Sequence, residues 1–130
     1  MTSGAGALAA LKASVRETPL EPWPMPAEQV LEGDPRASFA VLWQSPDRKR
    51  AIGVYECTPG RFTWDFTSDE TVCVVEGRAT IAPAGGEPFE LSAGDIVFFP
   101  TGLKTEWLVT ETLRDAFSVY SPEGLDLGSE

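Results

Sequence analysis

From residue 37 onward, short apolar runs alternate with turn residues at close intervals, and this pattern limits the fold more than any other feature. Each run is rich in Val, Ile, Phe, Trp and Thr, which favour β-strands. Gly, Pro, Asp and Ser separate the runs, at points where the chain can reverse. The predicted strands cover residues 38–44, 51–57, 61–67, 71–76, 79–83, 89–91, 96–99, 105–110 and 113–120. Many short strands at this spacing predict an all-β sandwich or barrel.

The first 36 residues differ from the rest in composition. Residues 7–17 have the alanine, leucine and lysine content of a short helix. The prolines that follow impose an extended path on Trp23 and Met25; they are Pro19, Pro22, Pro24 and Pro26. We expect an arm packed on the barrel or on a partner subunit, the alternative being a disordered tail to about Glu28. The predicted units are a leader and proline-rich arm (1–36), a barrel (37–121) and a loose C-terminal tail (122–130).

The charge balance excludes one class of partner. Twenty acidic residues against ten basic ones give a net charge of -10, so no basic face is expected to bind nucleic acid. The acidic excess favours solubility. A sharper interpretation is a pocket that prefers cationic or amine-bearing ligands.

Three features favour the cytoplasm. No apolar stretch is long enough to cross a bilayer, and the opening residues make a poor signal peptide. Cys57 and Cys73 fall inside apolar strand patterns without CxxC spacing, which predicts buried free thiols.

The chain contains no histidine, which excludes a Ser-His-Asp triad. The stretch GDIVFFPTGLKTEWLV contains Gly94, Pro100 and Gly102 at the spacing of the second cupin motif, G-x5-P-x-G-x2-H-x3-N, although that motif normally includes a histidine. Thr105 stands in the histidine position and Val109 in the asparagine position. Upstream, Glu70 and Gly77 resemble the E-x6-G end of the first cupin motif. Trp64 and Phe66 stand where its HxH pair falls, or Thr63 and Asp65 after a one-residue register change.

The chain thus resembles small single-domain cupins, in the branch of (S)-ureidoglycine aminohydrolase and the ethanolamine-utilisation cupins. The resemblance implies a jelly-roll β-barrel, commonly paired as a homodimer. A typical cupin holds a metal with three histidines and a glutamate, of which only Glu70 remains here. We therefore predict no metal and no cofactor. The alternative is a weak oxygen site of Asp65, Glu70 and Glu106, although Glu106 should point away if Thr105 points inward.

Glu70 is the predicted catalytic residue. Burial in an apolar barrel would raise its pKa towards neutrality, as a general acid or base requires. The alternative is a buried acid held by the hydroxyl of Thr105 or Tyr55. Trp64, Phe66 and Trp107 are either core or pocket lining. The predicted ligand-binding set is Trp64, Phe66, Glu70, Thr105 and Trp107.

Three functions remain open at this point. The first is a metal-independent module that binds a small organic metabolite in the barrel. The second is a metal-free isomerase, cyclase or hydrolase that uses Glu70 as general acid or base. The third is a structural dimer subunit whose barrel is filled by its aromatic side chains. A homodimer is expected on the resemblance and on the apolar surface of the arm.

Overall fold

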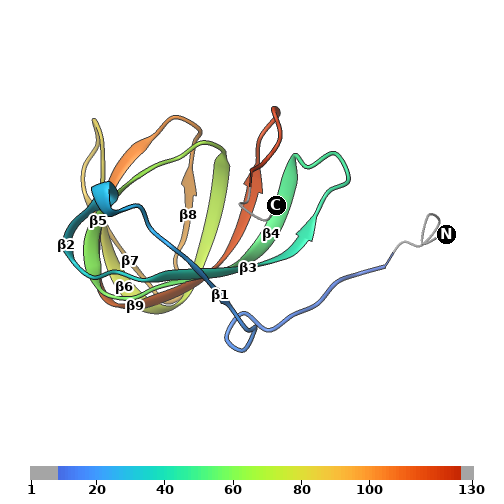
Figure 1. Ribbon diagram of the computed structural model, residues 1–130, viewed down its shortest axis with the longest axis horizontal. Coiled ribbons are helices and arrows are strands. Elements are labelled where there is room, and N and C mark those ends of the chain that lie inside the picture. Colours follow the sequence, from blue (N-terminus) through green and yellow to red (C-terminus); the bar gives the residue numbers. More distant parts are fainter. Residues whose placement is uncertain (1–8, 127–130) are drawn as a thin grey trace.

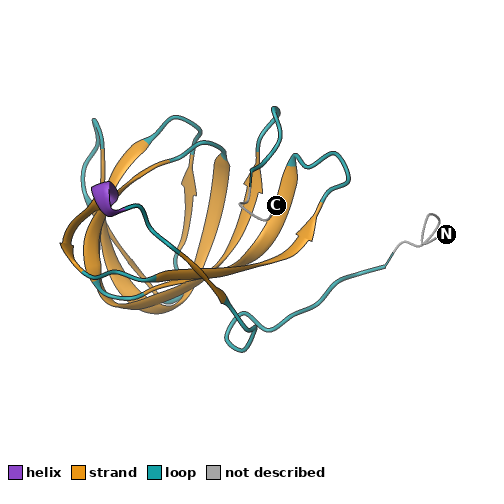
Figure 2. Cartoon of the chain, in the orientation of Figure 1, coloured by secondary structure: helices purple, strands orange, loops and turns teal. Residues whose placement is uncertain are grey.

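The computed structural model describes residues 9–126, and these residues form strands with a single short 3-10 turn. The elements are β1 (Glu21–Trp23), η1 (Ala27–Gln29), β2 (Val30–Gly33), β3 (Ala37–Gln44), β4 (Arg50–Cys57), β5 (Gly60–Asp65), β6 (Asp69–Pro83), β7 (Phe89–Ser92), β8 (Ile96–Phe99) and β9 (Lys104–Tyr120). Figure 1 shows the strands curling into a half-open barrel, and Figure 2 shows how little of the chain is helical. The predicted all-β jelly roll is confirmed.

The two longest strands, β6 and β9, each run through both sheets of the barrel and so join the sheets to each other. Residues 113–120 of β9 pair with β4 and with the first half of β6. Residues 104–109 of β9 pair with β5 and with the end of β6. The first sheet continues through β3 and β1 on one side and β8 on the other, and β2 and β7 flank the second sheet. The inward faces of the two sheets enclose the core.

The turns predicted at residues 76–77 and 110–112 are wrong, because the chain bends there without leaving its strand. The pairing of β6 with β9 shifts register beside these positions. Gly77 has a φ of +93°, and a Cβ atom on it would lie 2.1 Å from the carbonyl oxygen of Thr112. Only glycine allows this backbone conformation together with so close an approach.

The helix predicted for residues 7–17 does not form in residues 9–17, which contain one turn; residues 7 and 8 lie outside the described part of the chain. The guanidinium of Arg114 donates to the carbonyl oxygens of Val15 at 2.7 Å and Thr18 at 2.6 Å. A helix of this length is marginal in water. Instead of forming one, the segment lies against the outer face of the first sheet, where these two hydrogen bonds from Arg114 hold it.

The chain before residue 37 joins both sheets. Glu21–Trp23 pairs antiparallel with β3, and Val30–Gly33 pairs antiparallel with β5. Sequence patterns missed both strands, because prolines and charged residues hide the alternation. The division of the chain into an arm, a barrel and a tail stays a prediction.

The core concentrates where β5, β6, β8 and β9 meet. Phe66 stacks on Phe99 with ring centroids 4.3 Å apart, and Phe62 stacks on Trp107 at 6.0 Å. After β9, residues 121–126 fold back, and the Leu125 amide donates to a backbone oxygen of the β3–β4 hairpin at 2.7 Å. No helix within residues 9–126 is long and apolar enough to span a membrane.

The two cysteines lie on opposite faces of the first sheet. Cys57 is buried, as predicted, whereas Cys73 is exposed. The prediction of a buried thiol is wrong for Cys73 because β6 turns it outward, where it pairs with the exposed Ile96. Both are free thiols.

Candidate functional site

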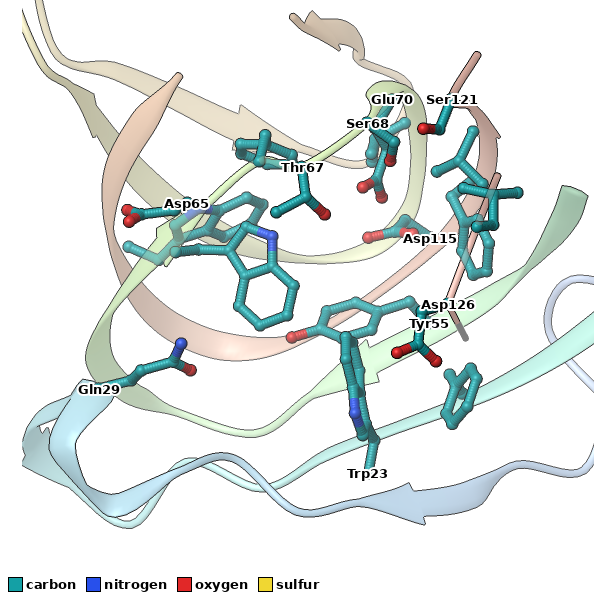
Figure 3. A pocket seen from close by; sticks show the side chains of 18 of the residues that line it. Trp23, Gln29, Tyr55, Asp65, Thr67, Ser68, Glu70, Asp115, Ser121 and Asp126 are labelled. Atoms are coloured by element: carbon teal, nitrogen blue, oxygen red, sulfur yellow. The ribbon is translucent and has the colours of Figure 1, made fainter. Parts of the chain in front are cut away.

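A cavity of about 680 Å³ lies inside the barrel between the two sheets. Trp23 and Gln29 from the N-terminal region lie on one side of it, and the carboxyl groups of Glu70 and Asp115 point into it from the barrel strands (Figure 3). Residues 121 and 123–126 line it where the chain folds back. The cavity therefore draws its walls from both ends of the chain as well as from the barrel.

Aromatic rings form one wall of this cavity. Trp23 meets Trp64 edge-on, with centroids 5.1 Å apart and an interplanar angle of 78°. Trp23 also packs on Phe39 at 5.3 Å. Tyr55 also lines the cavity and lies beside Trp23 in Figure 3. Trp23 reaches this position because β1 pairs with β3, so the proline-rich segment contributes directly to the site.

The structure places four of the five predicted ligand-binding residues along the cavity; they are Trp64, Phe66, Glu70 and Trp107. Asp65, which follows Trp64 on β5, is exposed at the rim of the cavity and pairs there with Lys104 at 3.0 Å. Phe66 and Trp107 are 4% and 6% exposed and stack within the core, so they offer little surface to a ligand. The ligand-binding roles themselves stay a prediction.

Thr105 is buried behind the cavity wall and is not part of the cavity surface. Its hydroxyl donates to the backbone carbonyl of Trp64 at 2.7 Å and accepts from the Nε1–H of Trp107 at 2.9 Å. It does not line the cavity, and it is 5% exposed. Both hydrogen bonds brace tryptophan-bearing strands, so Thr105 can act on the site only by positioning those rings.

Glu70 lines the cavity, and it is held by neither of the two hydroxyl groups predicted to do so, those of Thr105 and Tyr55. The hydroxyl of Thr105 is engaged elsewhere, and that of Tyr55 faces Cys57. Burial raises the pKa of Glu70 from 4.5 to about 7. This carboxyl group therefore exchanges its proton near neutral pH.

Asp115 is a second cavity carboxyl that sequence reasoning missed. It is 2% exposed, and its Oδ1 has no hydrogen-bond partner within the described part of the chain. Burial raises the pKa of Asp115 well above its usual range, and the charge of Glu70 raises it further. The missed signal is the inward series Leu113, Asp115, Phe117 and Val119, in which a single carboxyl interrupts apolar side chains.

Tyr55 and Cys57 are two further titratable groups near this pair. Burial raises the pKa of the Cys57 thiol to about 11 and that of the Tyr55 hydroxyl well above its ordinary value. Both groups therefore stay protonated at neutral pH, and Cys57 is a poor nucleophile.

The residues at the usual cupin metal positions do not fit a metal. Trp64 and Phe66 offer no suitable lone pair, and the Thr105 hydroxyl is engaged. No group of three or more His, Cys, Asp or Glu side chains in residues 9–126 could hold an ion. The alternative oxygen site does not assemble, because Asp65 pairs with Lys104 and Glu106 pairs with Arg61.

Residues 44–117 match the family model of the EutQ-like cupin domain. No curated protein matches the chain. Among solved structures, the EutQ protein of Clostridium difficile is 25% identical with a TM-score of 0.58, over 66% of this chain and 63% of that one. A protein of unknown function of the DUF861 family from Pseudomonas syringae pv. tomato is 24% identical with a TM-score of 0.73, over 80% and 45%.

A putative ethanolamine utilization protein Q from Salmonella typhimurium is 24% identical with a TM-score of 0.58, over 65% of this chain and 69% of that one. The chain spans less than two thirds of the C. difficile and P. syringae proteins. At this identity, the P. syringae and S. typhimurium structures support the fold alone.

Proposed function

The chain belongs to the EutQ-like cupin family, and from that premise we propose that it binds a small organic metabolite in its barrel without a metal. One observation carries the proposal, namely the unpaired buried carboxyl of Asp115 at the wall of a cavity of about 680 Å³. This volume falls in the range of small-molecule sites, about 300–1,000 Å³. A buried acceptor without a partner costs stability unless a ligand supplies the donor.

The same cavity disfavours a purely structural subunit. That alternative expects Trp64, Phe66 and Trp107 to fill the barrel. Phe66 and Trp107 do pack into the core, but Trp64 packs edge-on against Trp23 and leaves open space beside Glu70. The open volume therefore favours a ligand over a filled core.

A thermal-shift screen of polar metabolites, run with a chelator present, tests the proposal. We expect at least one compound to raise the melting temperature in a concentration-dependent way and to be recovered unchanged, because a ligand that binds only the folded state stabilises it. Stabilisation that requires an added metal, or no stabilisation by any compound, would overturn the proposal.

A metal-free enzyme is the second candidate, favoured by the pKa of Glu70. A carboxyl with a pKa of about 7 beside a second carboxyl whose pKa is raised by burial suits general acid–base catalysis. Mass spectrometry of the stabilising compounds after long incubation tests this candidate. Conversion by the wild type that is lost in Glu70→Gln would establish it, and unchanged compounds would refute it.

We also propose a homodimer, now through an outer surface of the first sheet rather than through the arm. Trp23 packs on Phe39 and Trp64 of its own chain and is 37% exposed, less than Ile96 and Phe98 of β8. Ile96 and Phe98 on the edge strand β8 are 68% and 56% exposed. Light scattering should give a dimer mass that falls towards monomer in Phe98→Lys but not in Glu87→Lys, a change in an exposed turn. A monomeric wild type would refute this.

Cytoplasmic residence completes the proposal. Both cysteines are free thiols, and thiols persist in reducing compartments. Cell fractionation would contradict this placement if the protein were found outside the cytoplasm.

A further inference from the structure

The charged side chains that line the cavity all carry the same sign. They are Asp65, Glu70, Asp115, Glu123 and Asp126. Within residues 9–126, no lysine or arginine lines it, although Asp65 is paired with Lys104 at the rim. A cleft with one sign of charge and apolar walls concentrates that field inside. An anionic ligand would therefore find no cationic side chain on the lining within residues 9–126.

The buried polar atoms that lack partners in this cavity are acceptors. Asp115 Oδ1 and Gln29 Oε1 both lie on the lining without a hydrogen-bond partner among the residues the structure describes. The third such atom, on Gln44, lies outside the lining. The unpaired buried atoms of the lining are therefore acceptors, although the hydroxyl groups of Thr67, Ser68 and Ser121 also border the cavity. A ligand that supplies N–H or O–H groups would remove the cost of these unpaired atoms.

Glu70 and Asp115 present their carboxyl groups to one region of the cavity (Figure 3). The two carboxyl groups repel each other when both are ionised, so the charge of Glu70 raises the pKa of Asp115. A cation between the two groups reverses that effect, since it stabilises the ionised form of each. A hydroxyl donor satisfies an acceptor but leaves the repulsion between the carboxylates.

The aromatic wall fits the body of such a ligand. Trp23 and Trp64 meet edge-on, and Tyr55 lies nearby, so ring surfaces border the space next to the carboxyl pair. Aromatic faces pack apolar groups and also attract cations. The site thus combines an acidic end with an aromatic side.

We propose that the ligand is an organic amine, bound as its ammonium form, whose nitrogen donates to Asp115 and Glu70 while its apolar body packs on the aromatic wall. This inference rests on the proposed function, because it names the class of ligand for the same cavity. The ammonium group supplies hydrogen-bond donors for the two carboxyl groups and the charge that the acidic lining favours. The proposal requires no metal and no covalent step.

Calorimetry with three probes of matched shape tests the inference: benzylamine, benzyl alcohol and benzoate, at about pH 7.5 with a chelator present. Benzylamine is protonated there, as a lysine amine is. We expect benzylamine to bind more tightly than benzyl alcohol by about tenfold or more, because charge-assisted hydrogen bonds are the stronger ones, and benzoate not to bind. Equal binding of the alcohol and the amine, or tighter binding of benzoate, would overturn the inference.

Two variants assign the contact to the carboxyl pair. Asp115→Asn and Glu70→Gln keep the shape of each side chain but replace a carboxyl group that can ionise beside an ammonium group with a neutral amide, and each should weaken benzylamine about tenfold while benzyl alcohol changes little. Glu90→Gln, on the outer surface, is the matched control and should change neither. If Asp115→Asn does not fold, Glu70→Gln decides alone. Unchanged benzylamine affinity in Glu70→Gln would refute the assignment.

The failure of this inference can be told apart from failure of the proposed function. If the metabolite screen yields only neutral or anionic stabilising compounds, the cavity binds ligands but the amine inference is wrong. If no compound of any charge stabilises the protein and no probe binds, both are wrong.

Discussion

The exchange Glu70→Gln should stabilise the protein, and only above the pH at which a glutamate ionises in the unfolded chain. The folded state raises the pKa of Glu70 from 4.5 to about 7 through burial. Between these values the folded state binds more protons than the unfolded state, so the free energy of unfolding falls as pH rises. The contribution of Glu70 is fully present below about pH 4.5 and is lost as pH passes through about 7.

The size of this effect follows from the shift. A difference of about 2.5 pKa units corresponds to about 3 kcal/mol, which is a ceiling because Glu70 is partly exposed. Glutamine keeps the shape and stays neutral. At about pH 4 the variant and the wild type should therefore be nearly equal in stability, whereas near pH 8 the variant should be more stable by up to about 3 kcal/mol.

Urea unfolding followed by tryptophan fluorescence at several pH values measures this difference. Glu87→Gln, in an exposed turn between β6 and β7, is the control and should show a flat difference across the range. A Glu70→Gln difference that stays within about 0.5 kcal/mol from about pH 4 to pH 8 would refute the burial argument.

Three further changes test the scaffold. Thr105→Val should destabilise the protein by about 2 kcal/mol in urea unfolding, because it leaves the Trp64 carbonyl and the Trp107 indole unpaired; an unchanged midpoint would contradict the bracing role. Gly77→Ala should cost about 3 kcal/mol or prevent folding, since its Cβ would overlap the facing strand, and a normal melting temperature would contradict the bend. Arg114→Met should speed tryptic cleavage of the N-terminal segment about tenfold, because that segment loses two charged donors; an equal rate would show that other contacts hold it.

The fold was readable from the sequence because local turn chemistry and strand alternation agree along most of the barrel. Gly77 was misread as part of a turn, since a glycine that permits a bend within a strand and a glycine that ends a strand look alike in sequence. Only the approach of the facing backbone distinguishes them. The missed strands β1 and β2 exist because β3 and β5 supply pairing edges, a non-local cause that a sequence pattern does not contain.

The candidate site was predicted in part. Motif spacing selected Trp64 and Glu70, which do line the cavity. It also selected Thr105, whose hydroxyl is hydrogen-bonded to the Trp64 carbonyl and the Trp107 indole and does not line the cavity. Asp115 lies outside both motifs, so spacing gave no reason to select it. The polar interruption of its inward apolar series did give one, and a count of inward-facing residues along that strand would have found it.

Metal content is the most direct test of the account, which holds that this cupin binds its ligand without a metal. The protein should be purified without an affinity tag or added ions, and its metals measured by mass spectrometry before and after exposure to Mn, Fe, Ni and Zn salts. The account predicts strongly substoichiometric metal in both samples. One tightly retained ion per chain, lost together with ligand binding in Glu70→Gln, would contradict it.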